Sequence, residues 1–77
     1  MTLDEFIENF AEQFDDTELS EFKPDTKFRE LEEWSSMITL GLIALADEEF
    51  GIRLKADDIR KSETIEELFN ILKTKAE

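Results

Sequence analysis

Apolar residues recur every three or four positions in two stretches, one near each end of the chain. This spacing gathers apolar side chains on one face of an α-helix. It predicts one helix over residues 3–14 and another from residue 65 toward the end of the chain. The apolar positions are Leu3, Phe6, Ile7, Phe10, Ala11 and Phe14 in the first stretch, and Ile65, Leu68, Phe69, Ile71 and Leu72 in the second.

Each of these two stretches begins with a Thr-x-x-Glu sequence. Thr2 precedes Glu5 by three positions, and Thr64 precedes Glu67 by three. In such a capping box the threonine hydroxyl accepts a hydrogen bond from the first turn, while the glutamate reaches back to the start of the helix. We therefore expect both helices to begin at these threonines, and the first to end before Asp15-Asp16.

The middle of the chain predicts a third main helix with a weaker sidedness. It should begin at Ser35 or Ser36, run to Glu49 or Phe50 and stop at Gly51. At 100° per residue, one side of this helix is predicted to pack on the core. The opposite side is also apolar near the start of the helix. The core face would hold Thr39, Leu42, Ile43, Ala46 and Phe50, with Leu40 beside it; the outward face would hold Met37, Gly41, Ala44 and Glu48.

The remaining segments predict connections and one short helix. Residues 17–34 indicate a long ordered loop with a helical turn over 27–32, and residues 52–54 an extended link. Residues 56–60 should form a brief helix that turns Ile59 inward. No stretch has the alternation of a strand. The pattern predicts a single domain over residues 1–77: a small all-α four-helix bundle with three main helices, one short helix and a long first loop.

Charge narrows the partners that such a bundle can have. Lysine and arginine number 9, aspartate and glutamate 21, and the net charge is −12. Binding to nucleic acid or anionic lipid needs basic patches, so neither is expected, whereas partners with basic surfaces are favoured. No apolar run is long enough for a membrane span, the N-terminus is acidic, and the chain has no cysteine. We expect a cytoplasmic protein without membrane insertion.

Little in the composition supports catalysis. The chain has neither histidine nor cysteine, and its two glycines cannot form a glycine-rich phosphate loop. Its acidic clusters lack the spacing of a calcium-binding loop, so we interpret them as solvated surface and predict no metal site. The protein is not expected to be an enzyme by itself.

The adjacent serines Ser35 and Ser36 stand where the middle helix should begin. Serine is a preferred N-cap, but one serine suffices for that role. A serine in the first turn is also well placed to carry a phosphodiester, because the free amides and the helix dipole favour an anion there. The second serine could therefore be a chemical handle.

In these features the chain resembles the acyl carrier proteins, small acidic helical proteins with a phosphopantetheine arm on a serine. In that family the serine lies in Asp-Ser-Leu at the start of the second helix, after a long loop. The helix ends in an acidic segment followed by Phe-Gly-Ile. Here Ser36-Met37 opens the helix, Asp47-Glu48-Glu49-Phe50-Gly51-Ile52 closes it, and fourteen positions separate Ser36 from Phe50. Residues 64–68 likewise resemble the start of the family's last helix.

The resemblance implies a covalent 4′-phosphopantetheine on Ser36 whose thiol holds an acyl group as a thioester. Ser35 takes the place of the family's aspartate and should keep the helix-cap role. The implied partners are a phosphopantetheinyl transferase and the enzymes that load, condense and modify acyl or aminoacyl groups, and the carrier would be a monomer. Expected partner-recognition residues are Met37, Gly41, Ala44, Asp47 and Glu48.

Departures from the family pattern indicate a specialised carrier rather than one for ordinary fatty-acid synthesis. Ile38 and Gly41 stand where fatty-acid carriers typically have acidic residues. Acyl carrier proteins usually have a glycine shortly before the modified serine, and this chain has Trp34 in that region. We interpret Trp34 as a packing anchor. Three alternatives stay open: a peptidyl or aminoacyl carrier, an unmodified carrier-like interaction module, and an acidic adaptor for basic proteins.

Overall fold

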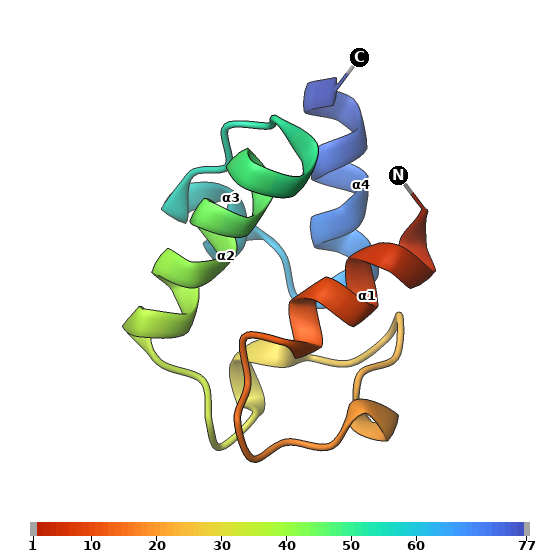
Figure 1. Cartoon of the computed structure of the whole chain (residues 1–77), viewed down its shortest axis with the longest axis vertical. Helices are drawn as coiled ribbons and strands as arrows, with labels where there is room; N and C mark the ends of the chain where they lie inside the picture. Colours follow the sequence, from red (N-terminus) through yellow and green to blue (C-terminus); the bar gives the residue numbers. More distant parts are fainter. Residues whose placement is uncertain (1, 77) are drawn as a thin grey trace.

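A computed structural model describes residues 2–76, and within them the chain is helical without strands. Two single turns of 3-10 helix lie in the long connection between the first two helices (Figure 1). Met1 and Glu77, the ends of the predicted domain, lie outside the described residues. The elements are α1 (Leu3–Ala11), η1 (Leu19–Glu21), η2 (Phe28–Glu30), α2 (Ser36–Phe50), α3 (Ala56–Lys61) and α4 (Ile65–Ala76).

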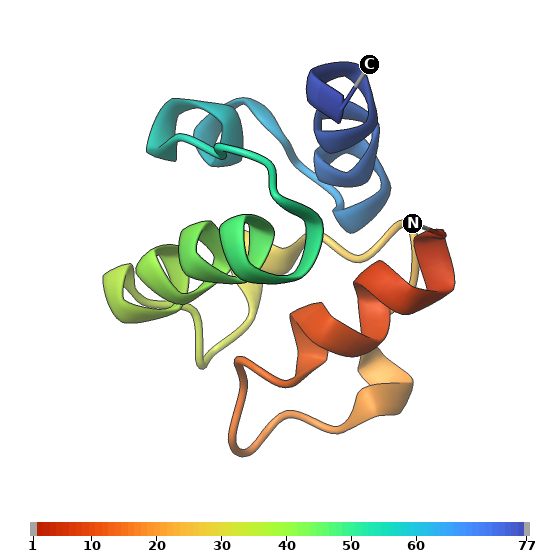
Figure 2. The ribbon, with the colours of Figure 1, turned by 45° about the horizontal axis from the view of Figure 1, so that its top comes forward.

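The four helices form a small bundle of two neighbouring pairs. α1 packs against α4, α2 packs against α3, and α3 also contacts α4 (Figures 1 and 2). The connection over residues 12–35 runs across one end of the bundle, while the start of α1 and the end of α4 lie toward the other (Figure 1). The predicted all-α bundle with one short helix is confirmed for the described residues. None of the helices described is both long and apolar enough to cross a membrane.

Phenylalanine side chains fill the centre of the fold. Phe10 has no solvent exposure, and its ring centroid lies 5.8 Å from Phe6 and 5.6 Å from Phe14, both from the first helical stretch. It also lies 6.0 Å from Phe22 and 5.4 Å from Phe28, which come from the long connection. Such ring pairs add to the stabilisation from burial. The connection is therefore anchored in the core by Phe22 and Phe28.

α1 is shorter than predicted and ends at Ala11 rather than near residue 14. Beyond it the Gln13 N–H bonds to the Phe10 carbonyl and the Phe14 N–H to the Ala11 carbonyl, so the last turn tightens. Phe14 remains buried and packs on Phe22 at 4.9 Å. The helical spacing of the apolar residues thus continued past the helix because a turn also delivers Phe14 to the core.

The limits of α2 are as predicted, but its buried face is different. Gly51 ends the helix in the left-handed conformation, with φ 63°. The fully buried residues are Ile38, Leu42, Leu45 and Ala46. Leu40 was predicted beside the core face and is instead 67% exposed, and Thr39 and Ile43 are only half-buried. The predicted face was right for Leu42 and Ala46 but omitted Ile38 and Leu45, because a helix that is apolar almost all round carries little information about sidedness.

The short helix α3 is tied to its neighbours by one carboxylate and one buried side chain. Ile59 points inward and is 1% exposed, as predicted. The Asp58 carboxylate accepts a hydrogen bond from the Lys55 N–H at 3.0 Å and pairs with Lys75 Nζ of α4 at 3.1 Å. Burial raises the pKa of Asp58, but these donors outweigh it and hold the pKa below its ordinary value.

Candidate functional site

Ser35 is the N-cap residue of α2. Its backbone is extended, and its Oγ accepts a hydrogen bond from the Ile38 N–H at 3.4 Å. The Ser35 carbonyl accepts the first helical bond from the Thr39 N–H at 3.1 Å. This is the geometry of an N-cap serine, which satisfies an amide that has no partner within the helix. Ser35 therefore caps α2, as expected from the sequence.

Ser36 is the first residue within α2, and its side chain is exposed. Because Ser35 makes the cap bond, the Ser36 hydroxyl is not needed for that purpose. Both serines are exposed, so they differ in use: Ser35 caps the helix and Ser36 does not. Ser36 offers an exposed hydroxyl on a helix whose start is held by its neighbour.

A groove of about 500 Å³ opens beside Ser36. It lies between the start of α2, the short helix α3 and the turn η2, and most of its surface is apolar. Its only charged lining residues are the two arginines Arg29 and Arg60, and no carboxylate lines it. The lining residues are Arg29, Trp34, Ser35, Ser36, Thr39, Leu40, Ala56, Ile59 and Arg60.

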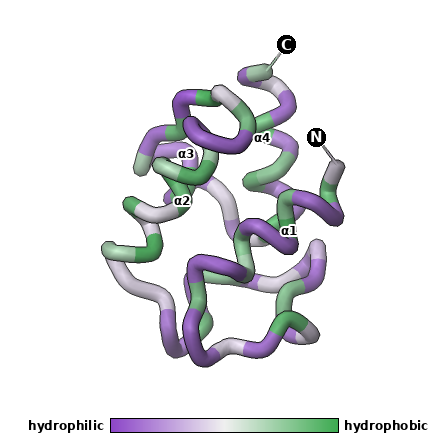
Figure 3. The backbone as a smooth tube through the Cα atoms, in the orientation of Figure 1, coloured by the Kyte–Doolittle hydropathy of each residue, from purple (hydrophilic) through white to green (hydrophobic). Residues whose placement is uncertain are grey.

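The expected partner-recognition residues fall into two groups. Met37 is 80% exposed, and Ala44, Asp47 and Glu48 are also exposed. The surface of α2 changes from apolar to acidic toward Gly51 (Figure 3). An apolar patch therefore adjoins Ser36, and an acidic one closes the helix.

Gly41 differs from the other four, because a neighbouring side chain covers it. A Cβ built at Gly41 would lie 2.4 Å from Gln13 Oε1. The approach is made by the end of a flexible side chain, which can shift, so it does not by itself require the glycine, a residue unfavourable within a helix. This contact places Gly41 beneath a side chain of the same molecule rather than on the open face of α2.

Ile38 and Leu40 differ in burial: Ile38 lies in the core and Leu40 lies on the surface. Ile38 stands where fatty-acid carriers typically have an acidic residue, but here it is 8% exposed and belongs to the core. Leu40, one turn from Ser36, is exposed and lines the groove. The open apolar surface of α2 thus consists of Met37, Leu40 and Ala44. Only the packing of α2 on its neighbours could have identified Leu40 as a surface residue.

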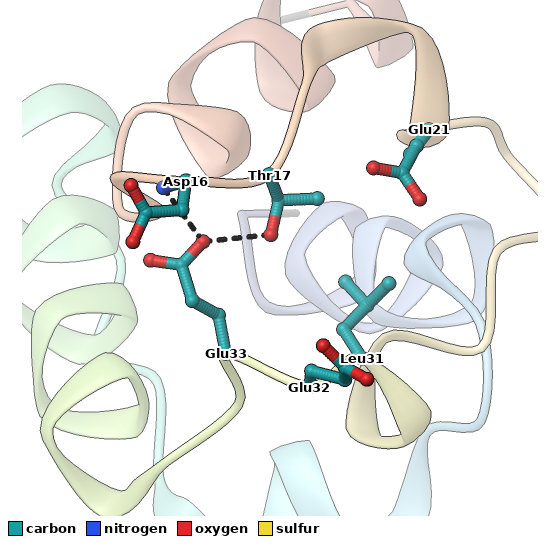
Figure 4. Close-up of a pocket in the computed structure, with 6 residues that line it drawn as sticks. All are labelled: Asp16, Thr17, Glu21, Leu31, Glu32 and Glu33. Carbon is teal, nitrogen blue, oxygen red and sulfur yellow. Dashed lines mark hydrogen bonds between the residues drawn. The ribbon is translucent and has the colours of Figure 1, made fainter.

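Sequence analysis missed Glu33, whose carboxylate joins the end of the α1 region to the segment before α2. Oε2 accepts from the Asp15 N–H at 2.7 Å, and Oε1 from the Asp16 N–H at 2.9 Å and the Thr17 hydroxyl at 2.7 Å (Figure 4). The hydrogen bond from the Thr17 hydroxyl is the main cause that lowers the pKa of Glu33; burial opposes it, and the hydrogen bonds from the Asp15 and Asp16 amides lower the pKa further. We call this set of three bonds the Glu33 clasp.

The Glu33 clasp borders an acidic hollow of about 430 Å³ (Figure 4). Its lining residues are Asp16, Thr17, Glu21, Leu31, Glu32 and Glu33. Within residues 2–76 no group of three or more His, Cys, Asp or Glu side chains is arranged to hold a metal ion. The Glu33 carboxylate, which borders the hollow, already accepts hydrogen bonds from protein donors on both oxygens.

Trp34 lies between the clasp and the groove. Its ring centroid is 5.1 Å from Phe28 and 6.5 Å from Phe14, so it packs on the aromatic core while bordering the groove. This agrees with its interpretation as a packing anchor. Its ring anchors the segment before Ser36 on the aromatic core.

Comparisons of the chain with models of known protein families, with curated protein sequences and with solved structures give no match. A function for this chain therefore has to come from its own residues and their geometry.

Proposed function

We propose that the protein is a carrier of acyl-carrier type, which holds an acyl group as a thioester on a 4′-phosphopantetheine arm attached to Ser36. One observation carries the proposal: an exposed serine hydroxyl, released from capping by Ser35, lies on the first turn of α2 beside an apolar groove. The motif and spacing of the resemblance point to the same serine. The absence of histidine and cysteine suits a protein whose reactive group is added later.

The residues present fit the attachment of this group. Ser36 Oγ would attack the coenzyme A phosphorus that bears the pantetheine, and the bond from that phosphorus to the bridging anhydride oxygen would break. Adenosine 3′,5′-bisphosphate leaves, and the hydroxyl proton passes to a base of the transferase. The carrier has no histidine to act as that base. Its contribution is an accessible oxygen on a helix start held by the Ser35 cap.

When bound, the arm supplies a thiol that forms and releases thioesters. The chain itself presents that thiol to partner enzymes and shields what is attached to it. The groove beside Ser36 is lined mainly by apolar surface, which favours an acyl group over an aminoacyl group with its charged amine.

The exposed surface of α2 suggests how partner enzymes recognise the carrier. Met37, Leu40 and Ala44 form an apolar surface next to Ser36, while Asp47 and Glu48 place negative charge at the far end. An enzyme that docks here needs an apolar contact near the arm and basic side chains farther away. This arrangement supports a specialised carrier, because the charge lies away from the attachment point.

Intact-mass measurement tests the attachment. The chain is incubated with coenzyme A and a broad-specificity phosphopantetheinyl transferase, together with Ser36→Ala and Ser35→Ala variants. We expect the mass of one arm to be added to the original chain and to Ser35→Ala, and no addition to Ser36→Ala. Both variants keep the buried core, so circular dichroism before the reaction controls for folding.

An unmodified interaction module is the second candidate, and Ser35 is the observation that favours it. Ser35 stands in the place of the aspartate that precedes the modified serine in acyl carrier proteins, where transferases read the sequence. If several transferases add no mass to the folded chain, the carrier proposal is wrong. The exposed apolar surface of α2 would then be the basis for binding a protein partner.

A further inference from the structure

We propose that Arg29 and Arg60 bind the phosphodiester of the arm on Ser36 and retain the first part of the arm in the groove between α2 and α3. This inference rests on the proposed function and adds a binding site to it. The site would use two arginines that line an apolar groove, one from η2 and one from α3. Ser36 is part of the same groove.

The charges around the groove differ from those of the whole chain. The protein has 21 acidic and 9 basic residues, yet the groove is lined by two arginines and no carboxylate. Arginine is suited to phosphate because its planar guanidinium presents paired N–H donors. A phosphodiester on Ser36 would place its anionic oxygens in the one described groove whose charged lining is entirely basic.

Both arginines have nearby carboxylates, and these define what the phosphate must compete with. Arg60 pairs with Asp57 on its own helix, but both side chains are about 70% exposed, and exposed pairs are weak in water. Arg29 also borders a smaller hollow that Glu30 and Glu63 help to line. Since a guanidinium has five N–H donors, each arginine can keep a carboxylate neighbour and still donate to a phosphate oxygen.

The apolar walls suit the next part of the arm. Beyond the phosphate, pantetheine carries a carbon with two methyl groups, and then two amides. Trp34, Leu40 and Ile59 supply apolar surface beside the arginines. The anionic phosphate of the arm would thus meet the two arginines, and the dimethyl carbon that follows it would meet the apolar walls of the groove. Leu40, which is 67% exposed, would be covered in part by the arm.

Phosphorus NMR of the loaded protein tests the inference. The original chain and the Arg29→Gln, Arg60→Gln and double variants are loaded, and mass spectrometry confirms the arm. Arg53→Gln is the matched control, because Arg53 is exposed and lies outside the groove lining. We expect the phosphorus signal of the original chain to be displaced from that of free phosphopantetheine. It should move toward the free position in each groove variant, most in the double variant, and stay in place in Arg53→Gln.

A second readout follows the thiol at the other end of the arm. Retention of the first part of the arm should slow the reaction of the thiol with a maleimide. The double variant should react faster by up to about fivefold, the factor that corresponds to the upper range of an exposed ion pair. Arg60→Lys, which keeps the charge and loses the paired donors, should lie between the original chain and Arg60→Gln.

The outcomes separate the two proposals. If the arm is attached and neither the phosphorus signal nor the thiol reactivity responds to the groove arginines, this inference is overturned and the carrier function stands. If the transferase adds no arm to the folded chain, the carrier function fails and this inference fails with it. Circular dichroism and melting of each variant before loading show that the arginine changes leave the fold intact.

Discussion

The segment over residues 29–36 separates two hollows that differ in almost every respect. On one side Glu33 and its acidic neighbours line a polar hollow, where three donors already hold the central carboxylate. On the other side Ser36 and two arginines border an apolar groove. The two hollows are similar in volume, at about 430 and 500 Å³.

The difference shows that the most hydrogen-bonded polar site of the molecule is not its functional candidate. Both oxygens of the Glu33 carboxylate accept hydrogen bonds within the fold, so its role is to hold two segments of the chain together. The groove leaves a hydroxyl and a large apolar side chain exposed to solvent. Buried or bonded polar groups stabilise a structure, whereas exposed reactive and apolar groups next to each other are available to a ligand.

The largest expected effect contrasts the core beneath the long connection with the surface of the groove. Phe10→Ala should lower the free energy of unfolding by about 3–5 kcal/mol, because it leaves a cavity among four aromatic neighbours. Leu40→Ala should change it by no more than about 0.5 kcal/mol, because Leu40 is already exposed. Urea unfolding followed by circular dichroism measures both. Equal effects would mean that the groove is part of the core.

The next effect concerns the Glu33 clasp and should be smaller than that of Phe10→Ala. Glu33→Gln replaces a carboxylate oxygen by an amide nitrogen, which cannot accept from a backbone N–H. We expect a lower melting temperature near neutral pH. Glu32→Gln is the matched control, because Glu32 is adjacent to Glu33 and its carboxylate accepts none of the three hydrogen bonds. If the two variants melt alike, the clasp does not stabilise the fold.

The same pair of proteins should show a defined dependence on pH. Folding lowers the pKa of Glu33 from its ordinary value of 4.5. The clasp therefore contributes its full stability above that value and loses it as the pH falls through the lowered pKa of the folded state. The difference in melting temperature between the original chain and Glu33→Gln should be greatest near neutral pH and shrink below pH 4.5. A difference that grows in acid would contradict this assignment.

The smallest expected effect distinguishes the two serines in the absence of any arm. Ser35→Ala removes the cap bond to the Ile38 N–H and should lower the free energy of unfolding by about 1 kcal/mol. Ser36→Ala should change it by less than about 0.5 kcal/mol, since the exposed hydroxyl does not cap the helix. Thermal or urea unfolding of the two variants provides the measurement. A larger loss for Ser36→Ala would reverse the proposed division of roles.

Much of the helical structure could be predicted from residues that lie close together in the sequence. The start of α4 is one example: Thr64 Oγ1 accepts from the Glu67 N–H at 3.2 Å, as its sequence predicts, while the Glu67 carboxylate bonds to the Glu63 N–H rather than to that of Thr64. The end of α2 at Gly51 is another. Caps and stops depend on residues within about four positions, and those residues are visible in the sequence.

The candidate site could be predicted only in part. Ser36 at the start of a helix followed from the cap preference and from the resemblance, but its groove did not, because η2, α2 and α3 meet there only in the folded chain. Leu40 was expected beside the core face and is exposed, and the burial of Ile38 was not predicted, since α2 has uncharged residues at every position from 37 to 46. Packing, rather than periodicity, chose which of them to bury.

By itself, the sequence determined the four α-helical segments, the stop of α2 at Gly51 and the position of a cap serine beside an available one. These depend on local hydrogen bonds and on the period of the helix. The tertiary structure decided which face of α2 is buried, that Glu33 clasps residues 15–17, and that two arginines border the groove beside Ser36. Each of those outcomes depends on contacts between elements that are distant in the chain, and the free energy of such contacts depends on the whole packed arrangement.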